Sequence, residues 1–422
     1  MKGKQQQQAR LIGLFFALAP VGVFLYLLAL ASPLLAFILY CCLYVGVASV
    51  RPSLALMLLF ASAPFNQDLS GGMLAHFSLA ELNLALAFPI CIFHGLKAGR
   101  PLRLGPISTW VTLYFVVCIV SSALTWHNSA VISFLQMGIY MVCAVIVFSS
   151  WLENPADYRL ILEAAAVMGV VLAVLGTFSG FSFPALHKNV YGAALANQVI
   201  IFTELWLSSR SKAQGRFLLL GLLIVGGALL LTLSRGGWLG ALVGVMVIFA
   251  CRRRFGTLVK LALIMTPILA LLWVGLPQES RDYATNFSAS RWNIKLRLKT
   301  LDQTRAMFDE SPLFGTGLGV RKELDATNLV LVTLAETGIL GCLTFLGIHL
   351  AVLRFGLQTL KRNPGEGSTL VVLAVALLAA RFAHGLVDEY WSRGALMQAW
   401  GAVGMGTYVY YLVAPSRRRS QA

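Results

Sequence analysis

The feature that most constrains this chain of 422 residues is a succession of long apolar segments separated by short polar breaks. A helix needs about 20 apolar residues to span a bilayer, and several of these segments approach that length. Backbone groups in lipid must form their hydrogen bonds inside the protein, and the alternating pattern of a membrane barrel does not appear. The sequence therefore predicts an all-α, polytopic membrane protein.

Composition excludes the common soluble classes. Apolar residues make up 58% of the chain and charged residues only 12%, about half the share that a soluble domain carries. A cytosolic enzyme, a disordered regulator and a disulfide scaffold are therefore excluded. The seven cysteines show no metal-ligand spacing, and we interpret them as small apolar filler. No metal and no cofactor is predicted.

We expect about 12 to 14 transmembrane helices, because two of the candidate segments are short for a span. The candidate spans are 11–30, 33–50, 53–66, 78–96, 107–126, 131–150, 160–178, 190–208, 217–234, 237–251, 256–276, 328–354, 368–387 and 394–414.

Lysine and arginine mark every second connection, which is typical of cytoplasmic loops. The basic positions are Lys2, Lys4 and Arg10; Arg51; Lys97, Arg100 and Arg103; Arg210, Lys212 and Arg216; Arg252, Arg253 and Arg254; Lys361 and Arg362; and Arg417, Arg418 and Arg419. Both termini are therefore expected in the cytoplasm. The net charge of +16 reflects topology, so no nucleic-acid partner is expected. Transmembrane helices should occupy 1–276 and 328–422, with a periplasmic loop at 277–327.

That loop is the only long hydrophilic segment, and between 281 and 305 it carries six basic residues against two acidic ones. It is either a solvated amphipathic helix or a site for an anionic headgroup, and we favour the site. Apolar residues at three- and four-residue spacing predict a helix over 295–310 at the membrane interface, ended by Pro312. The glycines at 315, 317 and 319 then permit a turn whose N–H groups can converge on an anion.

A second element surrounds Arg235, at the outer end of a predicted span. Arg235 either snorkels to the interface or uses its fork-shaped guanidinium to bind diphosphate oxygens. Gly236, Gly240 and Gly244 follow at four-residue spacing, which indicates a ridge for close helix packing.

Ionisable residues inside spans are expensive, so each is a candidate for function. Arg381, His384 and Asp388 share one helix face and form either a site or an internal ion pair. Further candidates are His187 and Lys188 at the start of a span, and Glu204 and Glu336 within spans.

Two separated motifs together resemble the bacterial O-antigen ligase and polymerase family. One is Leu-Thr-Leu-Ser-Arg-Gly-Gly at 231–237, and the other is an arginine, an amphipathic helix, Pro-Leu-Phe-Gly-Thr-Gly-Leu-Gly at 312–319 and the apolar segment from Asn328. The specific resemblance covers roughly 187–345.

The resemblance implies a GT-C-like, metal-independent glycosyltransferase of the bacterial inner membrane, active at the periplasmic face. Its expected partners are a glycan on undecaprenyl diphosphate, membrane lipid, and lipid A–core or a growing glycan as acceptor. Arg235 and Arg297 match the two arginines that hold the donor diphosphate in the family. The chain departs from the family at Thr327–Asn328, where a His-Asn pair is expected.

Without that histidine, either Glu336, Asp388 or His187 serves as the base, or the cationic clamp drives departure of the diphosphate. Two further alternatives are that the protein acts on a different acceptor or that it has lost activity. We expect diphosphate binding by Arg235, Arg291, Arg297, Arg305, His187, Lys188 and Asn328, and catalysis by Arg297, Arg235, Glu336 and Asp388. Ligation and polymerisation of O-antigen or exopolysaccharide repeats both stay open. A lipid-linked glycan flippase and a non-catalytic assembly subunit are the alternatives of other classes.

Overall fold

The computed structural model of the chain describes residues 13, 19–65, 78–152, 154–181, 188–285, 292–323, 328–362, 365, 367–388, 390–391 and 393–413. Every element of regular structure within these ranges is helical, which confirms the all-α prediction. Eleven of the helices described are long and apolar enough to cross a membrane. The chain is therefore a polytopic membrane protein.

Each predicted span corresponds to a helix or to a run of consecutive helices. The elements are α2 (Ala19–Ala31), α3 (Pro33–Val50), α4 (Pro52–Ser62), α5 (Leu79–Lys97), η2 (Gly105–Ile107), α6 (Ser108–Leu124), α7 (Ala130–Gly138), η3 (Ile139–Ala144), α8 (Val145–Ser150), α9 (Pro155–Phe178), α10 (Lys188–Leu207), α11 (Lys212–Leu231), α12 (Arg235–Arg252), α13 (Phe255–Gly275), α14 (Gln278–Thr285), α15 (Trp292–Glu310), α16 (Val320–Glu323), α17 (Leu329–Arg362), α18 (Ser368–Gly385) and α19 (Arg393–Val413).

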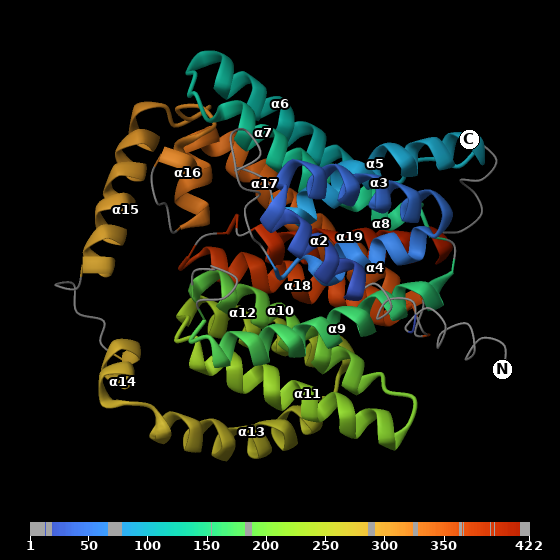
Figure 1. The fold of residues 1–422 in the computed structure, drawn as a ribbon. Helices are drawn as coiled ribbons and strands as arrows, with labels where there is room; N and C mark the ends of the chain where they lie inside the picture. Colours follow the sequence, from blue (N-terminus) through green and yellow to red (C-terminus); the bar gives the residue numbers. More distant parts are fainter. Residues whose placement is uncertain are drawn as a thin grey trace.

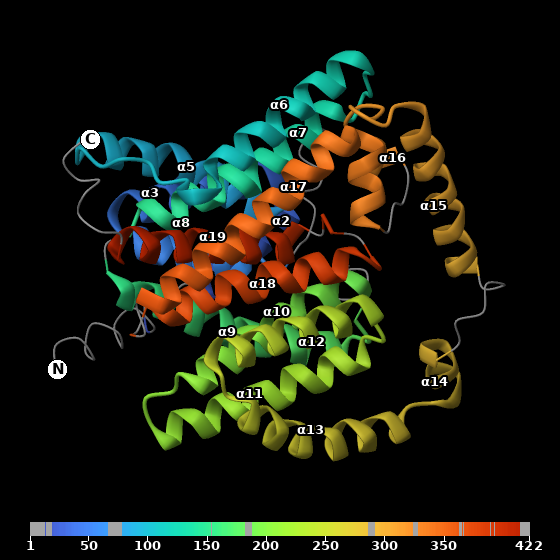
Figure 2. The same ribbon diagram turned by 180° about the vertical axis from the view of Figure 1, so that it is seen from behind.

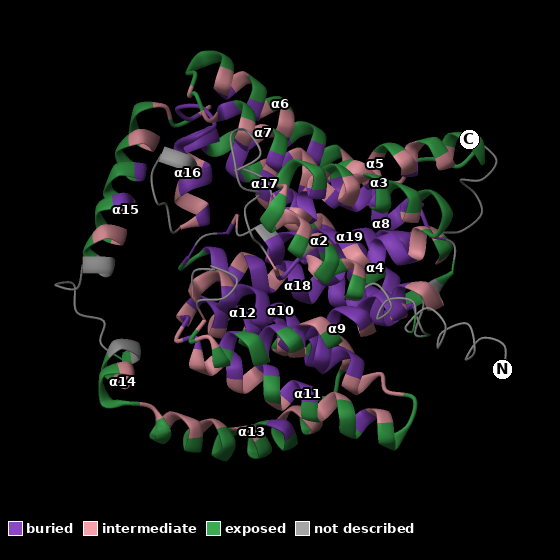
Figure 3. Cartoon of the chain, in the orientation of Figure 1, coloured by how far each residue is buried: buried purple, intermediate pink, exposed green. Residues whose placement is uncertain are grey.

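Helices α10, α18 and α19 form the centre of the bundle, and most of their residues are buried (Figure 3). α18 packs against α12 on one side and α19 on the other. In contrast, α13 lies along the outer side and exposes large apolar residues such as Leu263 and Leu271 (Figures 1 and 2). An apolar helix surface that protein does not cover is typical of contact with lipid.

The connections of the bundle gather at two ends. At one end, the Arg103 N–H donates to Ser150 Oγ at 2.9 Å, and the Arg254 guanidinium donates to the Leu207 carbonyl at 3.3 Å. Arg252 forms a buried ion pair with Glu204 at this end. At the other end lie α15 and α16 (Figures 1 and 2), together with the first residues of α12 and α17.

The predicted glycine ridge is confirmed, and it packs α12 against α18. A Cβ on Gly240 would lie 3.1 Å from the Ala380 carbonyl oxygen, and one on Gly244 would lie 3.3 Å from that of Ala376. Gly236 continues the series, against His384. The two backbones approach this closely because no side chain separates them.

The neighbouring face of α12 contacts α10. A Cβ on Gly237 would lie 2.7 Å from the Gly192 carbonyl oxygen. The obstacle is backbone rather than a movable side chain, so α12 and α10 must separate to admit even a methyl group.

We predict that Gly237→Ala destabilises the protein by about 1 to 3 kcal/mol through this overpacking. Thermal unfolding of the purified protein in detergent measures the change. Gly256→Ala is the matched control, because no atom lies within 4 Å of a Cβ at that position. Equal unfolding temperatures for the two variants would contradict the close packing of α12 against α10.

Candidate functional site

Helix α15 (Trp292–Glu310) confirms the helix predicted over 295–310, and Pro312 follows its end. Thr300 and Thr304 are buried, whereas Leu298, one of its regularly spaced apolar residues, is 46% exposed. The two threonine hydroxyls donate to carbonyls of the preceding turn, at 3.1 and 2.9 Å. Because their polar atoms are satisfied locally, these small side chains suit the contact of α15 with α17.

Arg297 lies one turn before Thr300 and reaches the segment that follows α18. Its guanidinium donates to the Val387 carbonyl at 2.9 Å and to Asp388 Oδ2 at 3.3 Å. The Arg297 side chain is 36% exposed and that of Asp388 is 11% exposed. The pair therefore stands at the boundary between the packed bundle and its surroundings.

Arg235 is the first residue of α12. The helix starts there because the Ser234 hydroxyl accepts the Gly237 N–H at 3.3 Å, while Leu233 takes a left-handed conformation. A Cβ on the next residue, Gly236, would lie 3.1 Å from the Asp388 Cβ. The chain thus brings the start of α12 against the carboxylate that Arg297 binds.

Asn328 joins the same region from α17. Its amide Nδ2 donates to the Leu386 carbonyl at 3.0 Å, and its Oδ1 accepts the Leu331 N–H at 3.1 Å. We refer to Arg235, Arg297, Asn328 and Asp388 as the Arg297 cluster. Four segments, distant in sequence, supply its members: α12, α15, α17 and the turn after α18.

His384, a candidate in the sequence analysis together with Arg381 and Asp388, belongs to this region too. Its side chain is buried beside Gly236, and neither ring nitrogen has a hydrogen-bond partner within the described part of the chain. Its position four residues before Asp388, on one helix face, is the pattern that made it a candidate.

The other predicted binding residues are Lys188, Arg305, Arg291 and His187. Lys188 is the first residue of α10. It lies at the same end of the bundle as the Arg297 cluster, since Gly192, one turn later, packs against Ser234 beside Arg235. Arg305 is exposed, two turns beyond Arg297 on α15. Arg291, His187 and Thr327 lie outside the described residues.

Glu336 lies in a different environment, within α17. Its side chain is fully buried, and Oε1 accepts the N–H of Gly319 at 3.1 Å and of Arg321 at 3.0 Å. The Arg321 guanidinium pairs with the same carboxylate. The N–H groups after the glycine turn do converge on an anion, but that anion is the protein's own carboxylate, so they are not open to a diphosphate.

The glycine turn itself is fixed by further bonds. The Thr316 N–H donates to the Ala335 carbonyl at 2.7 Å, and the Gly317 N–H donates to the Ser121 hydroxyl at 3.1 Å. Gly315, Gly317 and Gly319 all have positive φ, between 73° and 117°, which other residues adopt only at a cost. The turn therefore anchors the chain between α15 and α17.

Arg321 was not predicted, although it completes this anchor. Its guanidinium lies 4.3 Å from the centre of the Trp391 ring. Burial lowers the pKa of Arg321, but the Glu336 carboxylate more than offsets this and raises the pKa above its ordinary value. Arg321 therefore remains charged.

Residues 220–346 match the family model described as O-antigen ligase. Over these residues the chain is similar to the O-antigen ligase family. The predicted resemblance is thereby confirmed, and the match includes Arg235, Arg297, Asn328 and Glu336 but ends before Asp388. A search of curated proteins finds no match to the chain. The O-antigen ligase assignment implies a protein that handles a lipid-linked glycan and an acceptor within a membrane.

We predict that Glu336→Gln lowers the stability of the protein by about 3 to 5 kcal/mol, because it leaves the Arg321 charge buried and unpaired. Thermal unfolding measures the effect, and adding Arg321→Gln should restore part of it. Glu310→Gln, exposed at the end of α15, is the control. A Glu336→Gln protein as stable as the wild type but inactive would instead support catalysis by Glu336.

Proposed function

We propose that the protein transfers a glycan from undecaprenyl diphosphate to an acceptor, either lipid A–core or a growing glycan chain. The observation that carries the proposal is the convergence of Arg297, Asp388, Asn328 and the start of α12 at one end of a membrane bundle. A cationic fork and a carboxylate at one place are what a diphosphate leaving group and an acceptor hydroxyl need.

The arginines act on the donor. In the transfer, the acceptor oxygen attacks the anomeric carbon while the bond from that carbon to the diphosphate oxygen breaks. The diphosphate leaves with the electron pair, and the negative charge grows on its oxygens. Arg297 and Arg235 stabilise that charge, in a partly buried site where electrostatic interactions are stronger than in water.

Asp388 is the proposed base. A sugar hydroxyl is too weak an acid to ionise alone at neutral pH, so its proton must move as the new bond forms. Asp388 is the described carboxylate that Arg297 binds directly. When the diphosphate engages Arg297, the Asp388 carboxylate is released to accept the proton. This role replaces the histidine that the family pattern expects where the chain has Thr327.

The site is proposed to face the periplasm from the bacterial inner membrane. The basic connections, including Arg103, Arg252 and Arg254, lie at the opposite end, and lysine and arginine are enriched in cytoplasmic loops. The domain organisation proposed is therefore the predicted one: membrane helices over 1–276 and 328–422 and a periplasmic segment at 277–327.

A repeat-unit polymerase is the alternative within this class, and the departure at Thr327 favours it. A flippase needs charged residues that can exchange partners along a path through the bilayer. It fits less well, because the candidates Glu204 and Arg381 are both bound to other groups of the protein. Glu204 pairs with Arg252 near one end, and the Arg381 guanidinium donates to the Tyr390 carbonyl. Neither arrangement offers a path of exchangeable charges through the bilayer.

We predict that Arg297→Glu abolishes glycan transfer, because the reversed charge repels the diphosphate. The test complements a deletion strain with the variant and resolves its polysaccharide on a gel. A lost ligase leaves long glycan on the carrier, and a lost polymerase leaves single repeats on the finished lipid. Lys299→Glu is the matched charge reversal, exposed on the same helix. Equal transfer by wild type and Arg297→Glu at equal membrane levels would remove the site.

The Asp388→Asn variant distinguishes the role of the proposed base from that of the arginines that bind the diphosphate. We predict that turnover falls by about 10² to 10⁴, the usual range for a lost general base, while the KM for donor rises little because Arg297 is retained. Steady-state transfer by purified protein measures both constants. Asp302→Asn, exposed on α15, is the control. An unchanged turnover would show that Asp388 only positions Arg297.

A further inference from the structure

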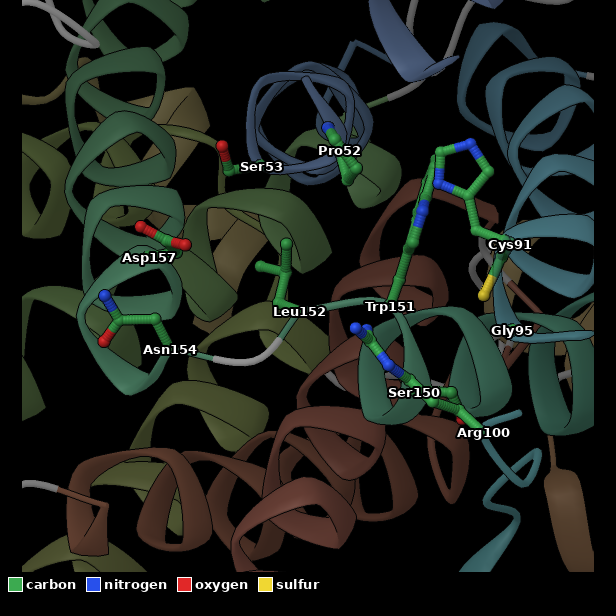
Figure 4. Close-up of a pocket in the computed structure, with 11 residues that line it drawn as sticks. Pro52, Ser53, Cys91, Gly95, Arg100, Ser150, Trp151, Leu152, Asn154 and Asp157 are labelled. Carbon is green, nitrogen blue, oxygen red and sulfur yellow. The ribbon is translucent and has the colours of Figure 1, made fainter. Parts of the chain in front are cut away.

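A polar cavity lies at the end of the bundle opposite the Arg297 cluster. Its volume is about 400 Å³, and its walls are the first turns of α4 and α9, the last turn of α5 and the segment after α8. Figure 4 shows Asp157 and Asn154 on the α9 side and Arg100 and Trp151 on the α5 side. The cavity therefore has one wall with a carboxylate and one wall with a guanidinium.

The indole N–H of Trp151 lacks a hydrogen-bond acceptor among the described residues. Its side chain lines the cavity and is only 5% exposed, yet the indole Nε1–H has no partner in the described part of the structure. An indole N–H can only donate, and a buried donor without an acceptor is costly. A ligand oxygen that reaches this N–H removes that cost.

The wall around Arg100 favours a negatively charged group. The Arg100 N–H donates to the Gly95 carbonyl at 2.8 Å, and the Arg103 N–H bond to Ser150 joins this turn to the end of α8. These bonds hold the backbone of Arg100 on the same side of the cavity as Trp151. The first turn of α4, which has no side-chain cap, contributes Ser53 to the lining, and the positive end of its dipole also favours an anion.

The opposite wall favours a cation. Asp157 is half-buried in the first turn of α9, and no ion pair joins it to another residue that the structure describes. The Asn154 side-chain carbonyl is already used, because it accepts the Ala156 N–H at 3.1 Å. The negative charge of this wall therefore comes from Asp157.

Apolar side chains beside the cavity indicate the source of the ligand. Phe93 and Leu96, in the same turn of α5 as His94, are 65% and 74% exposed. Large apolar residues next to a charged cavity suit a molecule whose polar head enters the cavity and whose chains lie along the helix.

We propose that this cavity binds a phospholipid whose head carries a phosphate and a primary ammonium, as in phosphatidylethanolamine. The phosphate accepts from Trp151 and Arg100, and the ammonium donates to Asp157. The inference does not rest on the proposed function, because none of these residues belongs to the Arg297 cluster.

The test is native mass spectrometry of the full chain in detergent, with lipids of identical acyl chains. We expect phosphatidylethanolamine to bind about tenfold more tightly than phosphatidylglycerol, which lacks the ammonium, or phosphatidylcholine, whose quaternary ammonium cannot donate. Soluble glycerophosphoethanolamine tests the source. If it competes at the same concentration as the lipid, the proposal of a lipid site is overturned.

Three variants assign the contacts. Trp151→Phe keeps the apolar ring and removes the donor, so it should weaken phosphatidylethanolamine binding about tenfold. Asp157→Asn should remove the preference over phosphatidylglycerol, and Arg100→Gln should weaken both lipids. Asp302→Asn, at the opposite end on α15, is the control and should bind as the wild type does. Unchanged phosphatidylethanolamine affinity in Trp151→Phe, or unchanged lipid preference in Asp157→Asn, would overturn the proposal. Unfolding temperatures confirm that the variants are folded.

Discussion

The buried carboxylate of Glu336 is the constraint on which the outer end of the molecule depends. A charge within a membrane helix must be neutralised and fully hydrogen-bonded, because no water is available to do so. Here the Gly319 and Arg321 N–H groups and the Arg321 guanidinium satisfy it. These bonds fix the glycine turn against α17. Since α15 runs directly into that turn, the position of Arg297 depends on a carboxylate in another part of the structure.

Helix ends supply the rest of the Arg297 cluster. Arg235 begins α12, Asn328 caps α17 and Asp388 follows α18. A helix end can present a polar group beside the membrane without an unsatisfied backbone group in lipid, provided that the end is capped. Ser234 and Asn328 provide those caps. The glycines of α12 then hold its start against α18, so that Gly236 contacts both His384 and Asp388.

Patterns that repeat along one helix were predictable from the sequence. The apolar runs, the helix at 295–310 and the Gly236–Gly240–Gly244 ridge each depend on local spacing, and each is found. Contacts between distant segments were not predictable. Nothing in the spacing indicates that Glu336 accepts from Gly319, or that Arg321 pairs with it. The buried face of α15 was missed because Thr300 and Thr304 satisfy their hydroxyls on their own helix and pack as small apolar residues.

The Arg297–Asp388 pair links the two halves of the proposed reaction. The pair is partly exposed and spans 3.3 Å, and a pair of this kind contributes little net stability. A diphosphate carries more negative charge than a carboxylate, and its oxygens can accept two parallel hydrogen bonds from the guanidinium. It therefore displaces Asp388 from Arg297. The carboxylate is then available to an acceptor hydroxyl only after the donor has bound. In the empty site the same ion pair keeps Asp388 occupied, and donor binding precedes activation of the acceptor.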